Sequence, residues 1–182
     1  GGVDYKGIAR AVLANLRDAR SQGGSTITMQ VAKNFYLPTE KTYTRKIYEL
    51  LLTLKIEKLL SKEQILELYM NQIFLGQRAF GFAAASEIYF GKPVKDLSIA
   101  ESAMLAALPV APSAYNPIVN PKRATVRQQF ILGRMLEEGF ITQEQYEAAR
   151  RQVLRYRTPS AVPVHAEYAV ETARQLVFAH YG

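Results

Sequence analysis

The feature that most limits the fold of this chain is a series of helix start signals along it. In a capping box, a Ser or Thr is followed three residues later by Glu or Gln, and a helix begins between them. Three such pairs open a segment of helical apolar spacing, at Ser61 with Gln64, Ser98 with Glu101, and Thr142 with Gln145. The alternation of apolar and polar residues that marks strands is nearly missing. The sequence therefore predicts an all-α fold.

The N-terminal third of the chain reads as three further helices. The first begins near Asp4. The second follows the turn at Gly23-Gly24, with Ser25 placed to cap it and Pro38 placed to stop it. The third spans about residues 44–60, and its apolar residues at helical spacing are Ile47, Leu50, Leu51 and Leu54.

The rest of the chain is divided by glycine and proline. Three glycines sit where helices should end, namely Gly76, Gly91 and Gly139. Residues 108–121 contain four prolines and are predicted to be an irregular loop, after which Asn120 and Pro121 start another helix. We therefore predict one domain over residues 1–154, followed by a linker and a short helix over residues 155–182.

Composition narrows the chemistry. The chain has no cysteine and only two histidines, His165 and His180, so a thiolate metal site is excluded and a histidine site is not expected. The net charge is +7, and the first 60 residues hold ten basic against five acidic residues, a surplus of +5. This surplus indicates nucleic acid, an acidic membrane or a phosphorylated substrate, unless it is only a solvated face. No apolar run approaches the roughly 20 residues that span a bilayer.

The stretch "GGSTITMQ", residues 23–30, opens the second predicted helix. With a cap at Ser25, one stripe of that helix is polar and carries Thr26, Gln30 and Lys33. A helix N-terminus offers free N–H groups and partial positive charge, which suit a phosphate oxygen or a sugar hydroxyl. The alternative is a capped helix whose polar side faces only water.

A second charged group lies in "TRKIYE", residues 44–49. Arg45 and Lys46 precede Glu49 by four and three residues, so all three share one side of a helix. They are either a surface ion-pair ladder, or a carboxylate held ionised among cations near a bound polyanion or its metal ion.

Four stretches, "GGSTITMQ", "RKIYE", "KEQILELYMN" and "RQQFIL", follow the order and spacing of the motifs of one enzyme family. With them the chain resembles the peptidoglycan glycosyltransferases of family 51, which include the N-terminal domains of class A penicillin-binding proteins. The third motif, Arg-Lys-x-x-Glu, is matched in full by Arg45, Lys46 and Glu49. The fourth, Lys-x-x-Ile-Leu-x-x-Tyr-x-Asn, is matched in full by Lys62, Ile65, Leu66, Tyr69 and Asn71.

The other motifs match in part. The second is met at Gly23, Ser25, Thr26 and Gln30, with Met29 in place of the first of two glutamines. The fifth is met at Arg127 and Leu132 and departs from the family at Gln128 and Ile131. Of the first motif only the tail is present, as Gly2, Val3 and Asp4. The resemblance places the acid/base glutamate about ten residues upstream of Asp4, so this chain is expected to lack it.

The resemblance implies a lysozyme-like helical domain with a larger globular lobe and a smaller membrane-facing lobe. It implies an inverting transferase that polymerises lipid II and releases undecaprenyl diphosphate. Glu49 is implied as the second active-site carboxylate, and a divalent cation, magnesium or manganese, is allowed near it; no organic cofactor is expected. The implied substrate-binding residues are Ser25, Thr26, Gln30, Lys33, Arg45 and Lys46.

The fourth and fifth motifs read as structural. Ile65, Leu66 and Tyr69 follow the spacing of core residues, Lys62 opens the motif, and Asn71 is expected to tie backbone segments together. Arg127 either reaches the active site or has a structural role, such as pairing with a helix acid, and we favour the structural role.

Aromatic and apolar residues mixed with cations between positions 35 and 52 suit either a lipid headgroup region or a partly buried helix connection. They are Phe35, Tyr36, Leu37, Tyr43, Tyr48 and Leu52, with Lys41, Arg45 and Lys46. The implied partners are lipid II, the growing glycan strand, the membrane surface and phosphoglycolipid inhibitors of the moenomycin type. The implied place is the outer face of the bacterial cytoplasmic membrane, with the anchor outside this chain and a transpeptidase domain allowed after it.

Three rivals remain at this point. A lysozyme-type glycoside hydrolase would need paired carboxylates and no cations for a diphosphate. A nucleic-acid-binding module would need a clustered recognition helix, whereas the bases here are dispersed among acids, so no nucleic acid is expected. A catalytically incomplete fragment that only binds the lipid diphosphate is the third.

Overall fold

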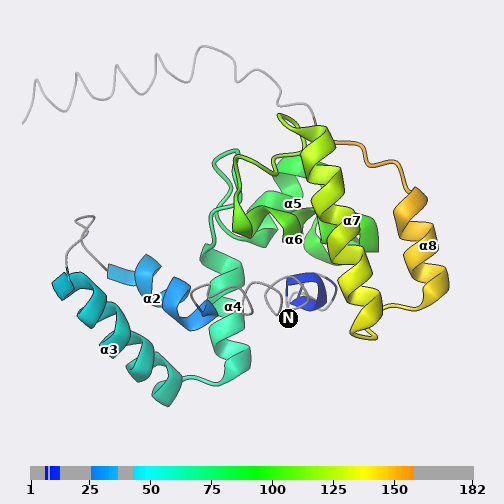
Figure 1. Ribbon diagram of the computed structural model, residues 1–182. Helices are drawn as coiled ribbons and strands as arrows, with labels where there is room; N and C mark the ends of the chain where they lie inside the picture. Colours follow the sequence, from blue (N-terminus) through cyan, green and yellow to red (C-terminus); the bar gives the residue numbers. More distant parts are fainter. Residues whose placement is uncertain (1–6, 8, 13–25, 37–42, 158–182) are drawn as a thin grey trace, which may run out of the picture.

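The computed structural model describes residues 7, 9–12, 26–36 and 43–157 of the 182 (Figure 1). The long elements are α2 (Ile27–Tyr36), α3 (Tyr43–Leu59), α4 (Lys62–Gln72), α5 (Phe82–Phe90), α6 (Ile99–Ala107), α7 (Pro121–Glu137) and α8 (Gln143–Arg151). Two short 3₁₀ turns are η1 (Val94–Asp96) and η2 (Leu108–Val110). The described part contains no strand beyond an isolated bridge between Phe74 and Phe80. The prediction of an all-α fold is confirmed.

The capping boxes begin the helices as predicted. At the start of α4, the Gln64 N–H donates to the Ser61 hydroxyl and the Ser61 N–H donates to the Gln64 side chain. The same reciprocal pair starts α6 at Ser98 and α8 at Thr142. Each box satisfies two backbone donors that a helix N-terminus otherwise leaves open. Pro121 opens α7 directly after Asn120, which was also predicted.

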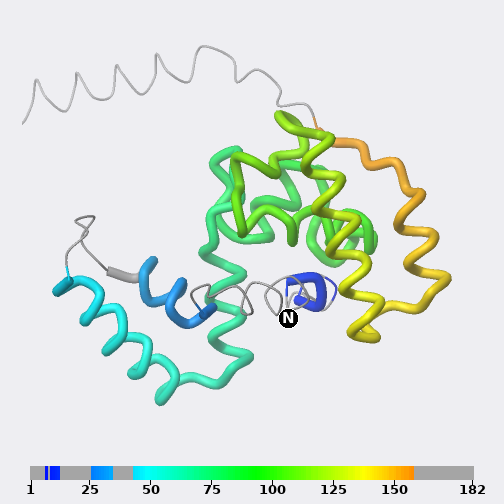
Figure 2. The backbone as a smooth tube through the Cα atoms, in the orientation of Figure 1, coloured from blue at the N-terminus to red at the C-terminus, as the bar shows by residue number. Residues whose placement is uncertain are grey.

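The core is centred on α6. Every residue from Ala100 to Leu108 is buried, and the helix packs against α5, α7 and α8 (Figure 2). Ala11 and Val12, from the described piece of the first helix, join the same core. At the other end of the molecule α2 packs between α3 and α4, and α4 also contacts α5. The helix α4 therefore connects the α2–α3 pair to the α5–α8 group.

The three glycines that were predicted to end helices behave differently. Gly91 follows α5 with φ +69°, and Gly139 lies just beyond α7 with φ +70°, both in the left-handed conformation typical of helix ends. The prediction for Gly76 is wrong, because α4 ends at Gln72 with Ile73 in extended conformation. Gly76 instead begins a tight turn, with φ +80°, inside a hairpin of residues 73–81.

The helix α3 exposes its apolar residues. Ile47, Leu50, Leu51 and Leu54 are each between 51% and 60% exposed, and Tyr43 and Tyr48 are exposed as well. The buried residues of this helix are instead polar, Glu49 and Thr53. Of the residues named for the two interpretations of residues 35–52, Tyr43 and Tyr48 are exposed and Leu52 is half-buried. Both the headgroup region and the partly buried helix connection stay predictions.

An extended segment follows α8 and returns to the domain. We call residues 152–157 the strap. The Tyr156 ring lies against Phe90 with centroids 5.6 Å apart, and the Arg157 N–H donates to the Tyr89 carbonyl at 2.8 Å. The division at residue 154 stays a prediction, and residues 158–182 lie outside the described part of the chain.

Candidate functional site

The start of α2 is built by the "GGSTITMQ" stretch. Ser25, the predicted cap, lies outside the described residues. The cap in the structure is Thr26, whose hydroxyl oxygen accepts the Met29 N–H at 3.1 Å. Gln30 is half-buried and Lys33 is exposed, while Val31 and Ala32 on the opposite side are fully buried. The polar stripe of Thr26, Gln30 and Lys33 is therefore present on α2, and it begins at the cap itself.

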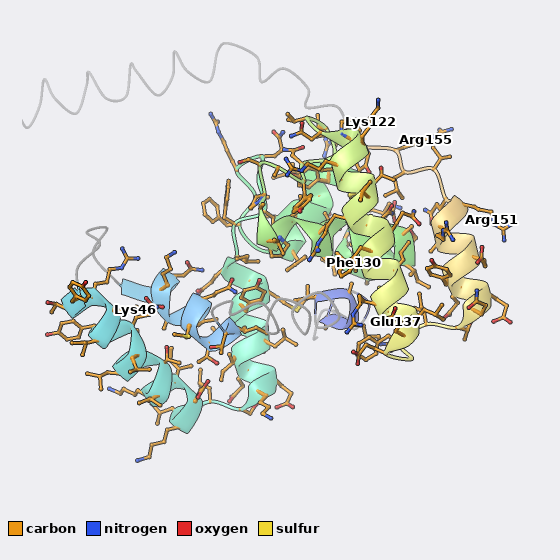
Figure 3. All side chains as sticks on the ribbon, in the orientation of Figure 1. Lys46, Lys122, Phe130, Glu137, Arg151 and Arg155 are labelled. Carbon is orange, nitrogen blue, oxygen red and sulfur yellow. The ribbon has the colours of Figure 1, made fainter. Side chains whose placement is uncertain are left out.

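The carboxylate of the third motif is buried beside an exposed cation. The Lys46 side chain lies on α3 (Figure 3). Its ammonium lies 2.8 Å from the Glu49 carboxylate, with side-chain exposures of 60% for Lys46 and 8% for Glu49. The hydroxyl of Thr53 donates to the Glu49 carbonyl at 2.7 Å, which secures the helix at this turn. Ordinary surface ion-pair ladders expose both partners, whereas here only the cation reaches solvent freely.

The helices α2 and α3 pack against each other, so the polar stripe and the ion pair belong to the same part of the molecule. Arg45 is half-buried on α3, directly before Lys46. This part therefore combines a capped helix N-terminus, exposed lysines from two helices and one buried carboxylate. Such a set can bind an anionic oxygen ligand.

Two residues of the fourth motif lie in the core, at the positions that the spacing indicated. Ile65 and Tyr69 are 6% and 1% exposed, and burial raises the pKa of the Tyr69 hydroxyl far above its usual value. Lys62 is exposed at the first turn of α4. The backbone of Asn71 lies directly against Gly81, because a Cβ added at Gly81 would be only 2.5 Å from the Asn71 carbonyl oxygen. The end of α4 and the hairpin thus touch so closely that only glycine fits.

The described contacts of the fifth motif link α7 to other parts of the domain. The Arg127 guanidinium lies over the rings of Phe130 and Tyr115, with its carbon 4.6 Å and 5.9 Å from the two centroids. Gln128, which departs from the family pattern, is buried and donates from its amide to the Ala100 carbonyl at 2.8 Å. Gln128 therefore joins α7 to α6, and the structural role of Arg127 stays a prediction.

One feature near these motifs was missed by sequence reasoning. Phe74 and Phe80 lie opposite each other in the hairpin with ring centroids 5.2 Å apart, and they are 40% and 64% exposed. Between them, Gln77 and Arg78 adopt positive φ angles of 48° and 59°, which non-glycine residues rarely do. In the sequence, Phe74 and Phe80 lie on either side of Gly76. A pattern this short does not distinguish a hairpin from an irregular loop.

The described residues provide neither a metal-binding cluster nor a membrane-spanning helix. They contain no cluster of three or more His, Cys, Asp or Glu side chains that could hold a metal ion by themselves. Among the same residues, no helix is both long enough and apolar enough to cross a bilayer.

Comparison with known proteins identifies the family of the chain. A family model described as "Transglycosylase" matches residues 1–136. A putative transglycosylase of Cupriavidus necator is 60% identical over 156 residues, which are 86% of this chain and 68% of that protein. Penicillin-binding protein 1A of Neisseria lactamica is 57% identical over 183 residues, covering all of this chain but only 23% of that protein.

A solved structure supports the same assignment. The crystal structure of penicillin-binding protein 1A from Haemophilus influenzae is similar with a TM-score of 0.63 and 30% sequence identity, over 99% of this chain and 20% of that one. The family model covers most of the chain, including the second, third, fourth and fifth motifs. The chain therefore belongs to the transglycosylase family.

Proposed function

We propose that this chain is the glycosyl-transferring part of a cell-wall enzyme that polymerises lipid II into glycan strands. The observation that carries the proposal is the buried Glu49 carboxylate held 2.8 Å from the exposed Lys46 ammonium. The motif that supplies both residues is complete, and the family model spans it. The Cupriavidus necator and Neisseria lactamica relatives are described as a putative transglycosylase and a penicillin-binding protein, which supports the same reaction class.

The proposed reaction joins an acceptor sugar hydroxyl to the anomeric carbon of the donor. A new carbon–oxygen bond forms, the bond from that carbon to the lipid diphosphate breaks, and configuration at the carbon inverts. The hydroxyl proton passes to a base, and the diphosphate leaves with the bonding electrons. The enzyme must therefore supply a base on one side and positive charge on the other.

The described residues fit the diphosphate side of this reaction. Lys33 and Lys46 are exposed on two packed helices and can meet phosphate oxygens as charges develop on the leaving group. The N-terminus of α2, capped by Thr26, adds backbone donors to the same part. Glu49, fixed by Lys46, orients that cation toward the ligand. By the resemblance, the base is the glutamate of the first motif, expected about ten residues upstream of Asp4.

A divalent cation fits this site only as a partner of the substrate. Glu49 is one carboxylate, and the described residues hold no cluster that could complete a protein-made metal site. Magnesium is commonly bound by one or two carboxylates together with substrate phosphates. If bound, it would neutralise diphosphate charge, with Glu49 as its contact from this chain.

The exposed face of α3 supports a position at a lipid surface. Its Leu50, Leu51 and Leu54 are more than half exposed, and exposed tyrosines lie on the same helix. Contiguous apolar surface of this kind marks an interaction site, and a lipid-linked substrate brings the enzyme to a membrane. We infer that α3 dips into the headgroup layer on the outer side of the cytoplasmic membrane.

The direct test is polymerisation of purified lipid II by the full-length natural protein and by its Glu49→Gln variant. We expect glycan strands and released undecaprenyl diphosphate from the first, and a nearly complete loss from the second. Release of reducing sugar ends from finished peptidoglycan, without use of lipid II, would instead support a lysozyme-type hydrolase. Binding of lipid II without turnover by the full-length protein would reduce this part to a binding module.

A further inference from the structure

Tyr89 joins three segments that are distant in the sequence. It lies in the last turn of α5 and is completely buried. Its hydroxyl donates to the Leu75 carbonyl in the hairpin at 2.9 Å, and its own carbonyl accepts the Arg157 N–H of the strap at 2.8 Å. One side chain and its backbone therefore connect α5, the hairpin and the strap.

The hairpin needs such support because its own backbone is strained. Three hydrogen bonds close it, from Gly81 to Ile73, from Leu75 to Ala79 and from Ala79 to Gly76. Gln77 and Arg78 at its tip hold positive φ angles, a conformation that side chains disfavour and that persists only where the surroundings enforce it. At Gly76 a Cβ would lie 2.8 Å from the Tyr89 hydroxyl oxygen, so the tyrosine is packed directly under the turn.

The hairpin also presents the exposed pair Phe74 and Phe80 to solvent. Exposed aromatic rings held side by side are costly in water unless a ligand covers them, and flat rings suit the apolar face of a sugar. The hairpin starts one residue after α4, which carries the fourth motif and packs against α2 of the candidate site. The glycan substrate proposed above has the chemistry that such a pair of rings would bind.

We propose that Tyr89 is a positioning residue of the transferase, which holds the hairpin in place for contact with the glycan and is itself held by the strap. The proposal rests on the proposed function for the identity of the ligand. Tyr89 is buried and does not touch the substrate; it acts through the Leu75 carbonyl. The strap completes this arrangement, which we call the clamp, because the Tyr156 ring lies against Phe90 and the Arg157 N–H donates to the Tyr89 carbonyl.

The first test is Tyr89→Phe in the full-length natural protein, with Tyr146→Phe on α8 as the matched control. Removing the hydroxyl leaves the buried Leu75 carbonyl without this donor, and we expect hydrogen exchange of the Leu75, Ala79 and Gly81 amides to become about tenfold faster. Exchange of helix amides in α4 and α8 should stay unchanged, which shows that the fold is intact. In lipid II polymerisation, we expect KM to rise severalfold while kcat stays within about twofold.

The second test addresses the strap. Arg157→Pro removes the N–H that reaches the Tyr89 carbonyl, whereas Arg157→Ala keeps the N–H and removes only the side chain. We expect faster exchange of the hairpin amides and a raised KM in the proline variant alone.

Four outcomes are distinguishable. Unchanged hairpin exchange in Tyr89→Phe overturns the clamp, and faster exchange with unchanged KM overturns the positioning role. Equal behaviour of the two Arg157 variants overturns the part played by the strap. If the unmodified protein bound lipid II without polymerising it, the proposed function would fail, while the exchange results would still test the clamp.

Discussion

The two ends of this molecule treat apolar and polar residues in opposite ways. In α6, at the centre of the α5–α8 group, the residues from Ala100 to Ala107 are buried and almost all are small or apolar. In α3 the buried residues are Glu49 and Thr53, and the leucines face outward. The first arrangement is what folding alone favours. The second costs stability. Under the proposed function, we expect ligand and membrane binding rather than folding to account for it.

The largest effect is expected at the buried carboxylate. Glu49→Gln keeps the shape of the side chain but removes the charge that fixes Lys46. We expect lipid II turnover by the full-length natural protein to fall by about a hundredfold to a thousandfold, with little change in thermal unfolding. Glu57→Gln, an exposed acid on the same helix, is the control and should retain activity. Near-normal turnover in Glu49→Gln would reduce the residue to an ion-pair partner.

The next effect tests the junction between the two ends. Gly81 has φ +81°, and a Cβ there would lie 2.5 Å from the Asn71 carbonyl oxygen and 3.1 Å from its Cα. Both contacts are with backbone, which cannot move aside cheaply. We expect Gly81→Ala to lower the free energy of unfolding by about 2–3 kcal/mol, measured by urea denaturation. A loss below half a kcal/mol would mean that α4 and the hairpin are not tightly joined.

The cations of the α2–α3 end should matter for ligand binding more than for stability. Lys33→Ala and Lys46→Ala each remove an exposed charge that can meet a diphosphate. We expect each to weaken binding of a lipid diphosphate, or of a phosphoglycolipid inhibitor, by about 1.5–3 kcal/mol in a titration. Lys58→Ala, exposed in the last turn of α3, serves as the control. Unchanged affinity in either variant would mean that the substituted lysine is only a solvated surface residue and does not contact the ligand.

The exposed leucines of α3 should contribute little to the free energy of unfolding but should contribute to membrane binding. Leu51→Glu and Leu54→Glu replace side chains that are 57% and 56% exposed, so the unfolding free energy should change little. Binding of residues 1–182 to anionic vesicles should weaken by about 1 kcal/mol or more for each, because the apolar contact is replaced by a charge. Val126→Glu, on exposed surface of α7, is the matched control.

Local signals made the fold of the α5–α8 group predictable from sequence. Capping at Ser98 and Thr142 depends on neighbours three residues away, and the structure has both boxes as expected. At the other end the helix spacing was found, but helical spacing is identical whether an apolar stripe faces a core or a membrane. The outward direction of Leu50 and its neighbours therefore could not be derived from the pattern.

The candidate site was predictable only as a set of motif residues. The pairing of Lys46 with Glu49 follows from helix geometry, but the burial of Glu49 depends on the packing of α2 against α3. The described cap is Thr26, while the predicted cap Ser25 lies outside the described residues, so that prediction is not tested. Gly76 was misassigned because a glycine in a hairpin turn and one at a helix end both need positive φ.

The smallest effect, and the one of opposite sign, is expected inside the well-packed end. Gly133 lies in the middle of α7, and a Cβ built there meets no atom within 4 Å. A helix-interior glycine costs roughly 0.5–1 kcal/mol relative to alanine, because it leaves the unfolded chain more freedom and adds no contact. Gly133→Ala should therefore raise the free energy of unfolding by about that amount in urea denaturation, leaving lipid II turnover unchanged. The same glycine-to-alanine substitution is expected to lower stability at Gly81, where the added Cβ would clash with backbone. Loss of stability at Gly133 would show that α7 is as tightly constrained as the hairpin, and the contrast between the two ends of the molecule would then be wrong.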